Sequence, residues 1–129
     1  MNVLFDYLYR DASNYKSWGN VVFAESHVDS LHTRQWELEL RKLFLDDTFA
    51  AHQIALPEVF TFPQGKAGAD DHCLHEFHSI ELTNEVPNDA KGRTFLEFLA
   101  EVRSASEEGW EGFDPASRLR EERAFRFQI

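Results

Sequence analysis

The alternation of side chains in residues 2–9, NVLFDYLY, constrains the fold of this chain more than any other feature of its sequence. Consecutive side chains of an extended backbone point to opposite sides, and aromatic and β-branched residues favour strands. We therefore expect a strand in which one side is strongly aromatic and must be covered by other elements. The side chains on that side are Val3, Phe5, Tyr7 and Tyr9, whereas Leu4 and Leu8 point the other way.

Further segments add strands and helices to this first strand. Residues 20–25, NVVFAE, are expected to form a second strand that pairs antiparallel with the first through a turn containing Asp11 and Asn14. Thr94 and Glu97 have the spacing of a capping box, which places the start of a helix at this point. The other expected elements are a helix over residues 30–45, a third strand over 48–56, a fourth strand over 73–83 and a short helix over 115–123.

The order of these elements predicts the class of the fold. The order β-β-α-β-β-α, followed by the short C-terminal helix, is typical of an α+β domain in two layers. We expect an antiparallel sheet of about four strands with the helices on one face. Residues 124–129, AFRFQI, alternate and are also compatible with a strand at the end of the sequence. The 129 residues fit a single domain, 1–129.

The helix expected over residues 30–45 is apolar on two sides. Leu31, Leu38 and Leu45 recur every seven residues, which places them on one side of a helix. The opposite side has the pattern of apolar residues that usually faces a core. Either the sheet and the C-terminal segment cover both sides, or one side docks on another chain. The residues of the core-facing side are Trp36, Leu40, Leu43 and Phe44.

Composition places the chain among folded proteins of a reducing compartment. Apolar residues make up 43% of the sequence, which is too many for a disordered chain. The single cysteine cannot form an internal disulfide. No basic segment precedes a long apolar run, and no apolar stretch approaches the roughly 20 residues that span a bilayer. We therefore expect a cytoplasmic protein without a membrane segment.

The formal net charge of −10 restricts the partners that the chain can bind. Proteins that bind nucleic acid neutralise phosphates with Lys and Arg, so direct nucleic-acid binding is disfavoured, even through the polar and aromatic loop at residues 9–18. An acidic surface suits a basic protein partner instead. Clustered arginines near the end of the sequence leave a homo-oligomer as a further option. They are Arg118, Arg120, Arg123 and Arg126.

Residues 70–81, DDHCLHEFHSIE, gather most of the side chains that are capable of chemistry. His, Cys and carboxylate groups bind zinc and other divalent metals. A His beside a carboxylate can also transfer protons, because the negative charge raises its pKa. The candidate metal ligands are His72, Cys73, His75 and His78, and the candidate catalytic residues are His75, Glu76 and His78.

The geometry of a strand separates these candidates. Because side chains alternate, neither side gathers all the candidate ligands. A metal would need ligands at i and i+2 on one side, or help from a neighbouring strand, which His52 on the expected third strand could provide. No CxxC or HExxH pattern is present. The first side is expected to carry His72, Glu76 and His78 together with the core residues Leu74, Ile80 and Leu82; the second is expected to carry Cys73, His75, Phe77 and Glu81.

The interval between Lys66 and Lys91 contains no Lys or Arg, and its carboxylates predict an anionic face. Complementary charge guides the encounter with a basic partner. We expect a non-enzymatic protein that needs no cofactor and modulates a protein partner, as an immunity protein, an inhibitor or an accessory subunit does. The alternative is a small metal- or His-dependent enzyme that uses residues 70–81 with zinc or another divalent metal. The expected binding residues are Asp70, Asp71, Glu76, Glu81, Glu85 and Asp89.

Two stretches, YLYRDASNYKSWGNVVF and DDHCLHEF, resemble a family of small bacterial proteins that are met as uncharacterised open reading frames. The resemblance covers mainly residues 1–25 and 70–77. It implies a bacterial or phage source and a compact single domain. It implies no catalytic residue at any position of this sequence.

Overall fold

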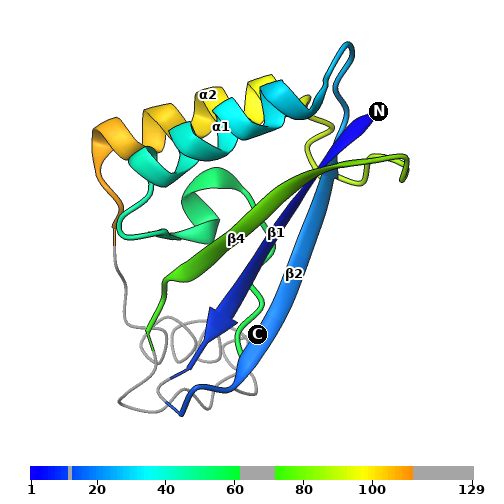
Figure 1. Ribbon diagram of the computed structural model, residues 1–129. Coiled ribbons are helices and arrows are strands. Elements are labelled where there is room, and N and C mark those ends of the chain that lie inside the picture. The colour runs from blue at the N-terminus through cyan, green and yellow to red at the C-terminus, as the bar shows by residue number, and fades with distance from the viewer. Residues whose placement is uncertain (12, 62–71, 112–129) are drawn as a thin grey trace, which may run out of the picture.

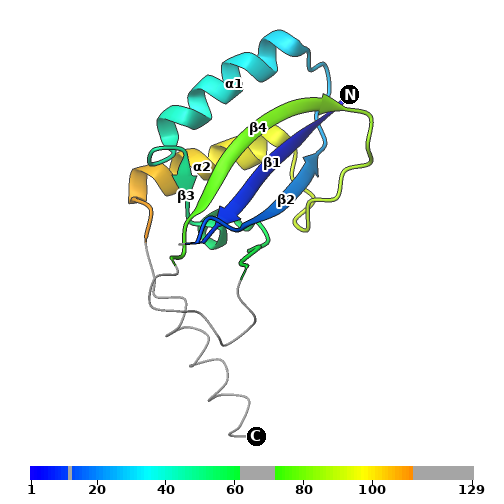
Figure 2. The same cartoon turned by 60° about the horizontal axis from the view of Figure 1, so that its bottom comes forward.

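The structure is a computed structural model that describes residues 1–11, 13–61 and 72–111. A four-stranded antiparallel sheet forms one layer and two helices form the other (Figures 1 and 2). The strands lie in the order β2-β1-β4-β3. The bounds are β1 (Asn2–Arg10), β2 (Lys16–Phe23), β3 (Thr48–Phe49), β4 (His75–Thr83), α1 (Ser30–Leu43) and α2 (Phe95–Glu108).

This arrangement confirms the predicted α+β fold with helices on one face of an antiparallel sheet. Both long helices begin where their capping residues predict. Asp29 caps α1 and Thr94 caps α2, and each side chain accepts a hydrogen bond from the first turn of its helix. The elements expected over residues 115–123 and 124–129 lie outside the described residues.

The first two strands pair antiparallel as predicted, but β2 begins before residue 20. The turn is tight because the Asp11 carboxylate accepts hydrogen bonds from the backbone N–H groups of Ser13 and Tyr15, both at 2.9 Å. Asn14 adopts the left-handed conformation, with φ of 66°, which asparagine tolerates better than most residues. Residues 16–19, which the sequence suggested were loop, therefore continue the ladder with β1.

The strand expected over residues 48–56 is wrong after its first two residues, because a short 3₁₀ helix, η1 (Ala51–Ile54), follows β3. Apolar residues in this segment do not alternate with polar ones, so a strand and a helix fit the sequence equally well. Ala51, Ile54 and Leu56 are all buried. A strand with a strict period of two cannot bury all three on one side, whereas a helical turn can.

Aromatic side chains fill the space between the sheet and the helices. The Phe5 ring lies at the centre of this core, with its centroid 5.2 Å from that of Phe98 on α2 and 5.3 Å from that of Phe77 on β4. The aromatic side of β1 is buried, as its alternation predicts. From the helices, Leu40 of α1 and Leu99 of α2 enter the same core.

A β-bulge interrupts the pairing of β4 with β1. Asp6 lies opposite Ser79 and Tyr7 lies opposite Phe77, so that His78 has no partner on β1. One extra residue in a strand shifts the alternation of everything that follows it. The two ends of β4 therefore follow different alternations.

The bulge overturns the predicted sides of β4. Phe77 and Ile80 are both buried, although regular alternation would place them on opposite sides. Of the expected core residues Leu74, Ile80 and Leu82, Ile80 is buried as predicted, whereas Leu74 and Leu82 are only partly buried. Glu81 consequently lies on the side opposite to the buried His75, not on the same side.

A buried arginine joins the start of α2 to η1. The side chains of Arg93 and Asp89 are 4% and 3% exposed, and they share two hydrogen bonds of 2.9 Å. Arg93 also donates to the backbone carbonyls of Ile54 and Ala55 and to the carboxylate of Glu101. The guanidinium is therefore fully engaged, as a buried charge must be to avoid a large desolvation cost.

Candidate functional site

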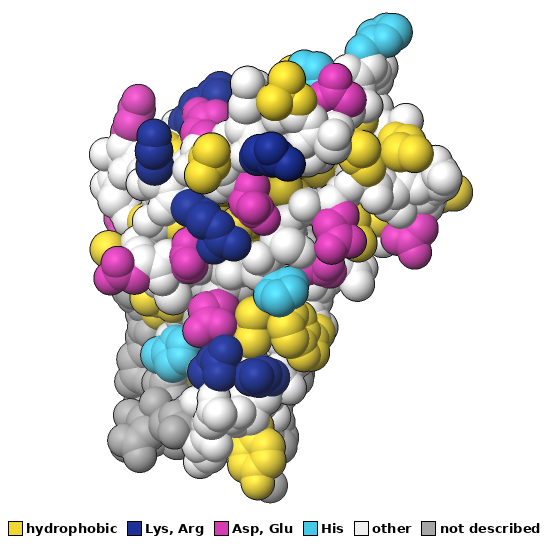
Figure 3. All heavy atoms as spheres, viewed as in Figure 1, with side chains coloured by type: hydrophobic (Ala, Val, Ile, Leu, Met, Phe, Trp, Pro, Cys, Tyr) yellow, Lys and Arg dark blue, Asp and Glu magenta, His cyan; other side chains and the backbone are white. Residues whose placement is uncertain are grey.

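One face of the sheet is turned away from the helices (Figures 1 and 2). Among the described residues, this face is covered by no helix or strand. We call it the open face. Acidic, basic, histidine and hydrophobic side chains lie side by side there (Figure 3). Its side chains are Leu4, Asp6, Leu8 and Arg10 from β1, Trp18, Asn20 and Val22 from β2, and Glu76, His78, Ser79 and Glu81 from β4.

An exposed tryptophan and a histidine lie at the centre of the open face. Trp18 is 55% exposed, and its ring meets that of His78 edge to face with 5.0 Å between the centroids. Leu8 is the register partner of both Trp18 and Glu76, and it is buried although it belongs to this face. A large aromatic side chain beside a buried apolar residue is typical of an anchor at a protein interface.

Three carboxylates, Asp6, Glu81 and Glu85, lie towards one end of the open face, and we call them the acidic cluster. Partial burial raises the pKa of Asp6 above its ordinary value, and the charges of Glu81 and Glu85 raise it further against an opposing effect of His78. The Asn2 side chain donates to the backbone oxygen of Glu85 at 2.9 Å, which holds the segment after β4 beside β1. Like charges thus accumulate here and weaken the fold.

We expect Asp6→Asn to stabilise the fold at pH 7. The pKa of Asp6 in the folded chain lies above the ordinary 3.8, so its ionisation costs stability as the pH rises from acid to neutral. Asparagine removes this cost. The midpoint of thermal unfolding, followed by circular dichroism, should therefore rise modestly at pH 7 and stay unchanged at about pH 3. Glu107→Gln on α2 is the control, and an equal gain at both pH values would contradict the expectation.

An ion pair occupies the other end of the open face. The Arg10 guanidinium donates to both oxygens of the Glu76 carboxylate, with Nε–Oε1 and Nη2–Oε2 distances of 3.3 and 3.2 Å. Arg10 also donates to the side chain of Asn14 at 2.6 Å. The sequence suggested Glu76 as an anionic binding residue and as a catalytic residue. In the structure its charge is already compensated by Arg10.

The structure divides the predicted anionic face. Glu81 and Glu85 are exposed and belong to the acidic cluster. The Asp89 carboxylate is buried in the arginine cluster at the start of α2, so it cannot contribute to a surface. Asp70 and Asp71 lie outside the described residues. Of the four predicted binding residues that the structure describes, Glu81 and Glu85 therefore combine with Asp6 on this side of the sheet.

The histidines of residues 70–81 do not converge. The His75 ring is fully buried, and its Nε2 accepts a hydrogen bond from the backbone N–H of Val59 at 3.0 Å. The Nε2 atom of His72 lies 2.7 Å from the backbone oxygen of Arg10. His78 lies on the open face. Among the residues that the structure describes, no three His, Cys, Asp or Glu side chains are placed to hold one metal ion.

The same placement separates the candidate catalytic residues. His75 points into the core, whereas Glu76 and His78 belong to the opposite side of β4. Cys73 is buried. His52 lies on η1 rather than on a strand beside the run, so its expected position is wrong. The three candidate catalytic residues therefore do not meet at one site, although Glu76 and His78 share the open face.

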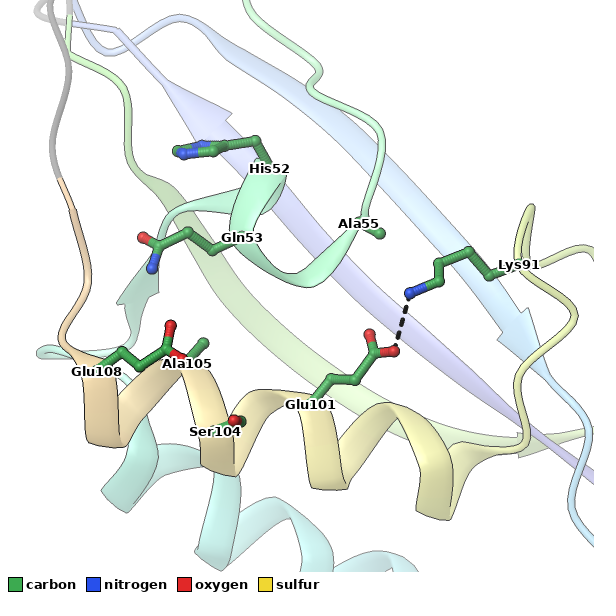
Figure 4. A pocket seen from close by; sticks show the side chains of 8 residues that line it. All are labelled: His52, Gln53, Ala55, Lys91, Glu101, Ser104, Ala105 and Glu108. Carbon is green, nitrogen blue, oxygen red and sulfur yellow. Dashed lines mark hydrogen bonds and ion pairs between the residues drawn. The ribbon is translucent and has the colours of Figure 1, made fainter.

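A shallow hollow of about 400 Å³ lies between η1 and α2 (Figure 4). Lys91 and Glu101 form an ion pair of 2.9 Å at one end, and His52 and Glu108 lie towards the other. Glu101 also accepts a hydrogen bond from Arg93, so two cations already compensate its charge. The hollow borders the buried arginine cluster and offers no convergent set of uncompensated polar groups.

Comparisons of the chain with protein-family models, with curated proteins and with solved structures gave no match. The resemblance of residues 1–25 and 70–77 to small bacterial proteins stays a prediction. Within the described residues, the helices are too short or too polar to cross a bilayer. The side chains of the open face, with the acidic cluster and the Trp18–His78 pair, are therefore the features that indicate a function.

Sequence reasoning missed Asp6 and the position of Trp18. Alternation in residues 2–9 places Asp6 between Leu4 and Leu8, on the side away from the aromatic core. A charged residue in the middle of that side was the signal that the side is open. Trp18 was assigned to a loop, and only the tight turn before β2 brings it onto the sheet.

Proposed function

We propose that the protein is a non-enzymatic binding protein that holds a basic protein partner on its open face. The observation that carries the proposal is the acidic cluster beside the exposed Trp18–His78 pair. Such a combination provides charge that guides encounter and an aromatic anchor that supplies affinity. The protein acts in the manner of an immunity protein, an inhibitor or an accessory subunit, and works in the cytoplasm.

The cost of the acidic cluster supports this proposal. The pKa of Asp6 is raised by burial and by neighbouring carboxylates, so the cluster weakens the fold at neutral pH. Residues that break a local rule of stability without compensation are typical of functional sites. A partner that places Lys or Arg against Asp6 and Glu81 removes the repulsion when it binds, and this relief adds to its affinity.

Capture experiments test the proposal. Tagged wild-type protein and the double variant Glu81→Lys/Glu85→Lys are used as baits in lysate of the native host at low salt, and bound proteins are identified by mass spectrometry. We expect a basic protein on the wild-type bait that is at least tenfold depleted on the double variant. Its affinity for the wild type, measured by calorimetry with purified components, should fall as salt increases. Trp18→Ala should weaken binding at all salt concentrations.

A matched charge change elsewhere serves as the control. Glu107→Lys/Glu108→Lys at the end of α2 alters the net charge by the same amount, and both residues are exposed. This control should retain the partner. Equal loss with both double variants would mean that net charge alone matters, and unchanged capture by Glu81→Lys/Glu85→Lys would refute the open face as the binding surface.

A further inference from the structure

The outermost strand of the sheet, β2, directs backbone hydrogen-bonding groups away from the sheet (Figures 1 and 2). The N–H of Val22 donates to the side chain of Asn88 at 2.8 Å, and the carbonyl of Val22 accepts from the N–H of Asn88 at 3.0 Å. Both backbone groups of Val22 therefore point away from β1. The register with β1 is regular, so the backbone groups of Lys16, Trp18 and Asn20 point the same way.

This edge of β2 is covered at one end and free at the other. Asn88 covers the edge at Val22, and the N–H of Phe95 donates to the carbonyl of Ala24 at 3.0 Å. Within the described residues, no hydrogen bond reaches the outward-pointing backbone groups of residues 16–20, which we call the free edge. A row of free donors and acceptors is a template for the addition of another strand.

The free edge is complementary to itself. When two copies pair antiparallel about Trp18, Lys16 of one copy lies opposite Asn20 of the other, and the two Trp18 residues lie opposite each other. This register pairs every outward-pointing backbone group of the free edge. It also brings together two tryptophans that are 55% exposed in a single copy, and aromatic pairs across strands stabilise sheets. Because β2 begins at Lys16, neither strand extends as far as Asn88 of the other copy.

Charge favours a second copy in this register. Asn20 lies opposite Asp6 of β1, so Lys16 of the second copy has Asp6 as its next neighbour across the joined sheet. Adjacent strands are about 4.8 Å apart, which places the two Cβ atoms about 10 Å apart, and a long lysine side chain can bridge this separation to a carboxylate. Within the described part of one copy, neither Lys16 nor Asp6 forms an ion pair. Each copy thus offers the charge that the other lacks.

We propose that the free edge of β2 pairs with the free edge of a second copy, so that two four-stranded sheets join into one. Lys16 of each copy then pairs with Asp6 of the other. The interface is small, so the dimer is reversible and forms at micromolar or higher concentrations. The inference does not rest on the proposed function, because the joined sheet leaves Glu81 and Glu85 exposed to a basic partner.

Sedimentation velocity with two charge variants tests the dimer. Lys16→Glu and Asp6→Lys each place like charges at both ends of the interface, so each variant alone should dimerise at least tenfold more weakly than the wild type. An equimolar mixture restores opposite charges at both ends in a heterodimer and should associate as the wild type does. Lys42→Glu on α1 is the control, because Lys42 is exposed and the change in net charge equals that of Lys16→Glu.

Proline at position 20 tests the backbone pairing. Asn20→Pro removes an N–H that points towards the free edge, and it leaves the hydrogen bonds between β2 and β1 in place. The dimer should therefore be lost while circular dichroism shows a folded chain. Asn20→Ala removes the same side chain but keeps the N–H, so it should dimerise as the wild type does. The two charge variants decide the question if proline unfolds the chain.

Hydrogen exchange followed by NMR locates the contact. The amides of Lys16, Trp18 and Asn20 should exchange at least tenfold more slowly at high than at low protein concentration, because the second copy accepts their hydrogen bonds. The amide of Gly19, which points towards β1, should not change with concentration. Protection of the three outward amides at every concentration would mean that the edge is covered within one chain, and it would overturn the proposal.

Three other results would also overturn the proposal. They are a wild type that stays monomeric up to millimolar concentration, a mixture of charge variants that associates no better than each alone, and a dimer that survives Asn20→Pro. Protection of the free edge that appears only when another protein is added, without a dimer, would assign the edge to a strand of that protein instead. Glu81→Lys/Glu85→Lys should dimerise as the wild type does, so failure of the open face and failure of the dimer are recognised independently.

Discussion

Arg93→Met should lower the free energy of unfolding by about 3–5 kcal/mol, a large share of the roughly 5–15 kcal/mol available to a domain. The substitution leaves the Asp89 carboxylate buried without its cation, and it removes the donors to the carbonyls of Ile54 and Ala55. Methionine restores most of the apolar volume over the Phe98 ring, where the guanidinium carbon now lies 5.2 Å from the centroid. The loss therefore measures the unpaired charge more than a cavity.

Urea unfolding of Arg93→Met and Arg103→Met measures this difference in a matched pair. Arg103 also binds a carboxylate through two nitrogens, at 2.6 and 2.9 Å from Glu39, but its side chain is 50% exposed. Exposed pairs contribute little, so Arg103→Met should cost less than about 1 kcal/mol. Similar losses for the two variants would show that burial of the Arg93 cluster has no energetic importance.

The pH dependence gives a second test of the same cluster. Burial opposes ionisation of Asp89, but hydrogen bonds and charge from Arg93 outweigh it and hold the pKa of Asp89 below 3.8. This carboxylate therefore stabilises the fold above its unfolded pKa, and the contribution is lost as the pH falls through the folded value. In Arg93→Met, protonation of Asp89 removes an unpaired charge instead. The difference between variant and wild type should consequently shrink at about pH 3.

Gly19→Ala is expected to destabilise the fold by about 1–3 kcal/mol, although alanine normally suits a strand better than glycine. A Cβ atom at Gly19 would lie 2.8 Å from Cζ of Tyr7, which is closer than carbon atoms approach in proteins. The Tyr7 ring cannot move away easily, because it is fully buried and its hydroxyl donates to the backbone oxygen of Pro57 at 2.6 Å. The sign of the change therefore tests the contact: without it, alanine would stabilise by about 0.5–1 kcal/mol.

A double-mutant cycle with Tyr7→Leu isolates this contact. Leucine at position 7 removes the ring atoms that lie over Gly19, so Gly19→Ala should cost much less in that background than in the wild type. Asn20→Ala, on the opposite face of β2, controls for the general preference of the strand for alanine. Chemical unfolding of the variants provides the energies. Equal costs in the two backgrounds would mean that Tyr7 does not limit this position.

Local patterns were sufficient for most of the fold. The alternation of residues 2–9 and the capping box at Thr94 specify β1 and α2, because each depends on neighbouring residues alone. The segment 48–56 could not be resolved in this way, since its apolar residues fit a strand and a helix equally. The sheet order and the role of Arg93 depend on contacts between distant residues, which no local pattern contains.

The candidate site was less predictable than the fold for the same reason. The carboxylates of the interval 70–89 include Glu81 and Glu85, which belong to the acidic cluster. The sequence does not show that Asp89 is buried in an ion pair with Arg93, or that Arg10 compensates the charge of Glu76. It also omitted Asp6, because Asp6 is distant in sequence and enters the cluster only through the pairing of β1 with β4. The prediction grouped carboxylates that are close along the chain, whereas the acidic cluster is formed by residues that are neighbours across the sheet.

The bulge in β4 gives this strand one residue more than its core contacts need. His78 has no partner on β1, and the buried Phe77 and Ile80 would keep their places on a shorter, regular strand. Loss of a residue at a regular position of a strand moves the following side chains to the opposite face of the sheet, whereas loss of His78 would leave the buried side chains of β4 on the core side. His78 is therefore the place where evolution or an engineer can alter the length of β4, and with it the surface beside Trp18, while the architecture is preserved.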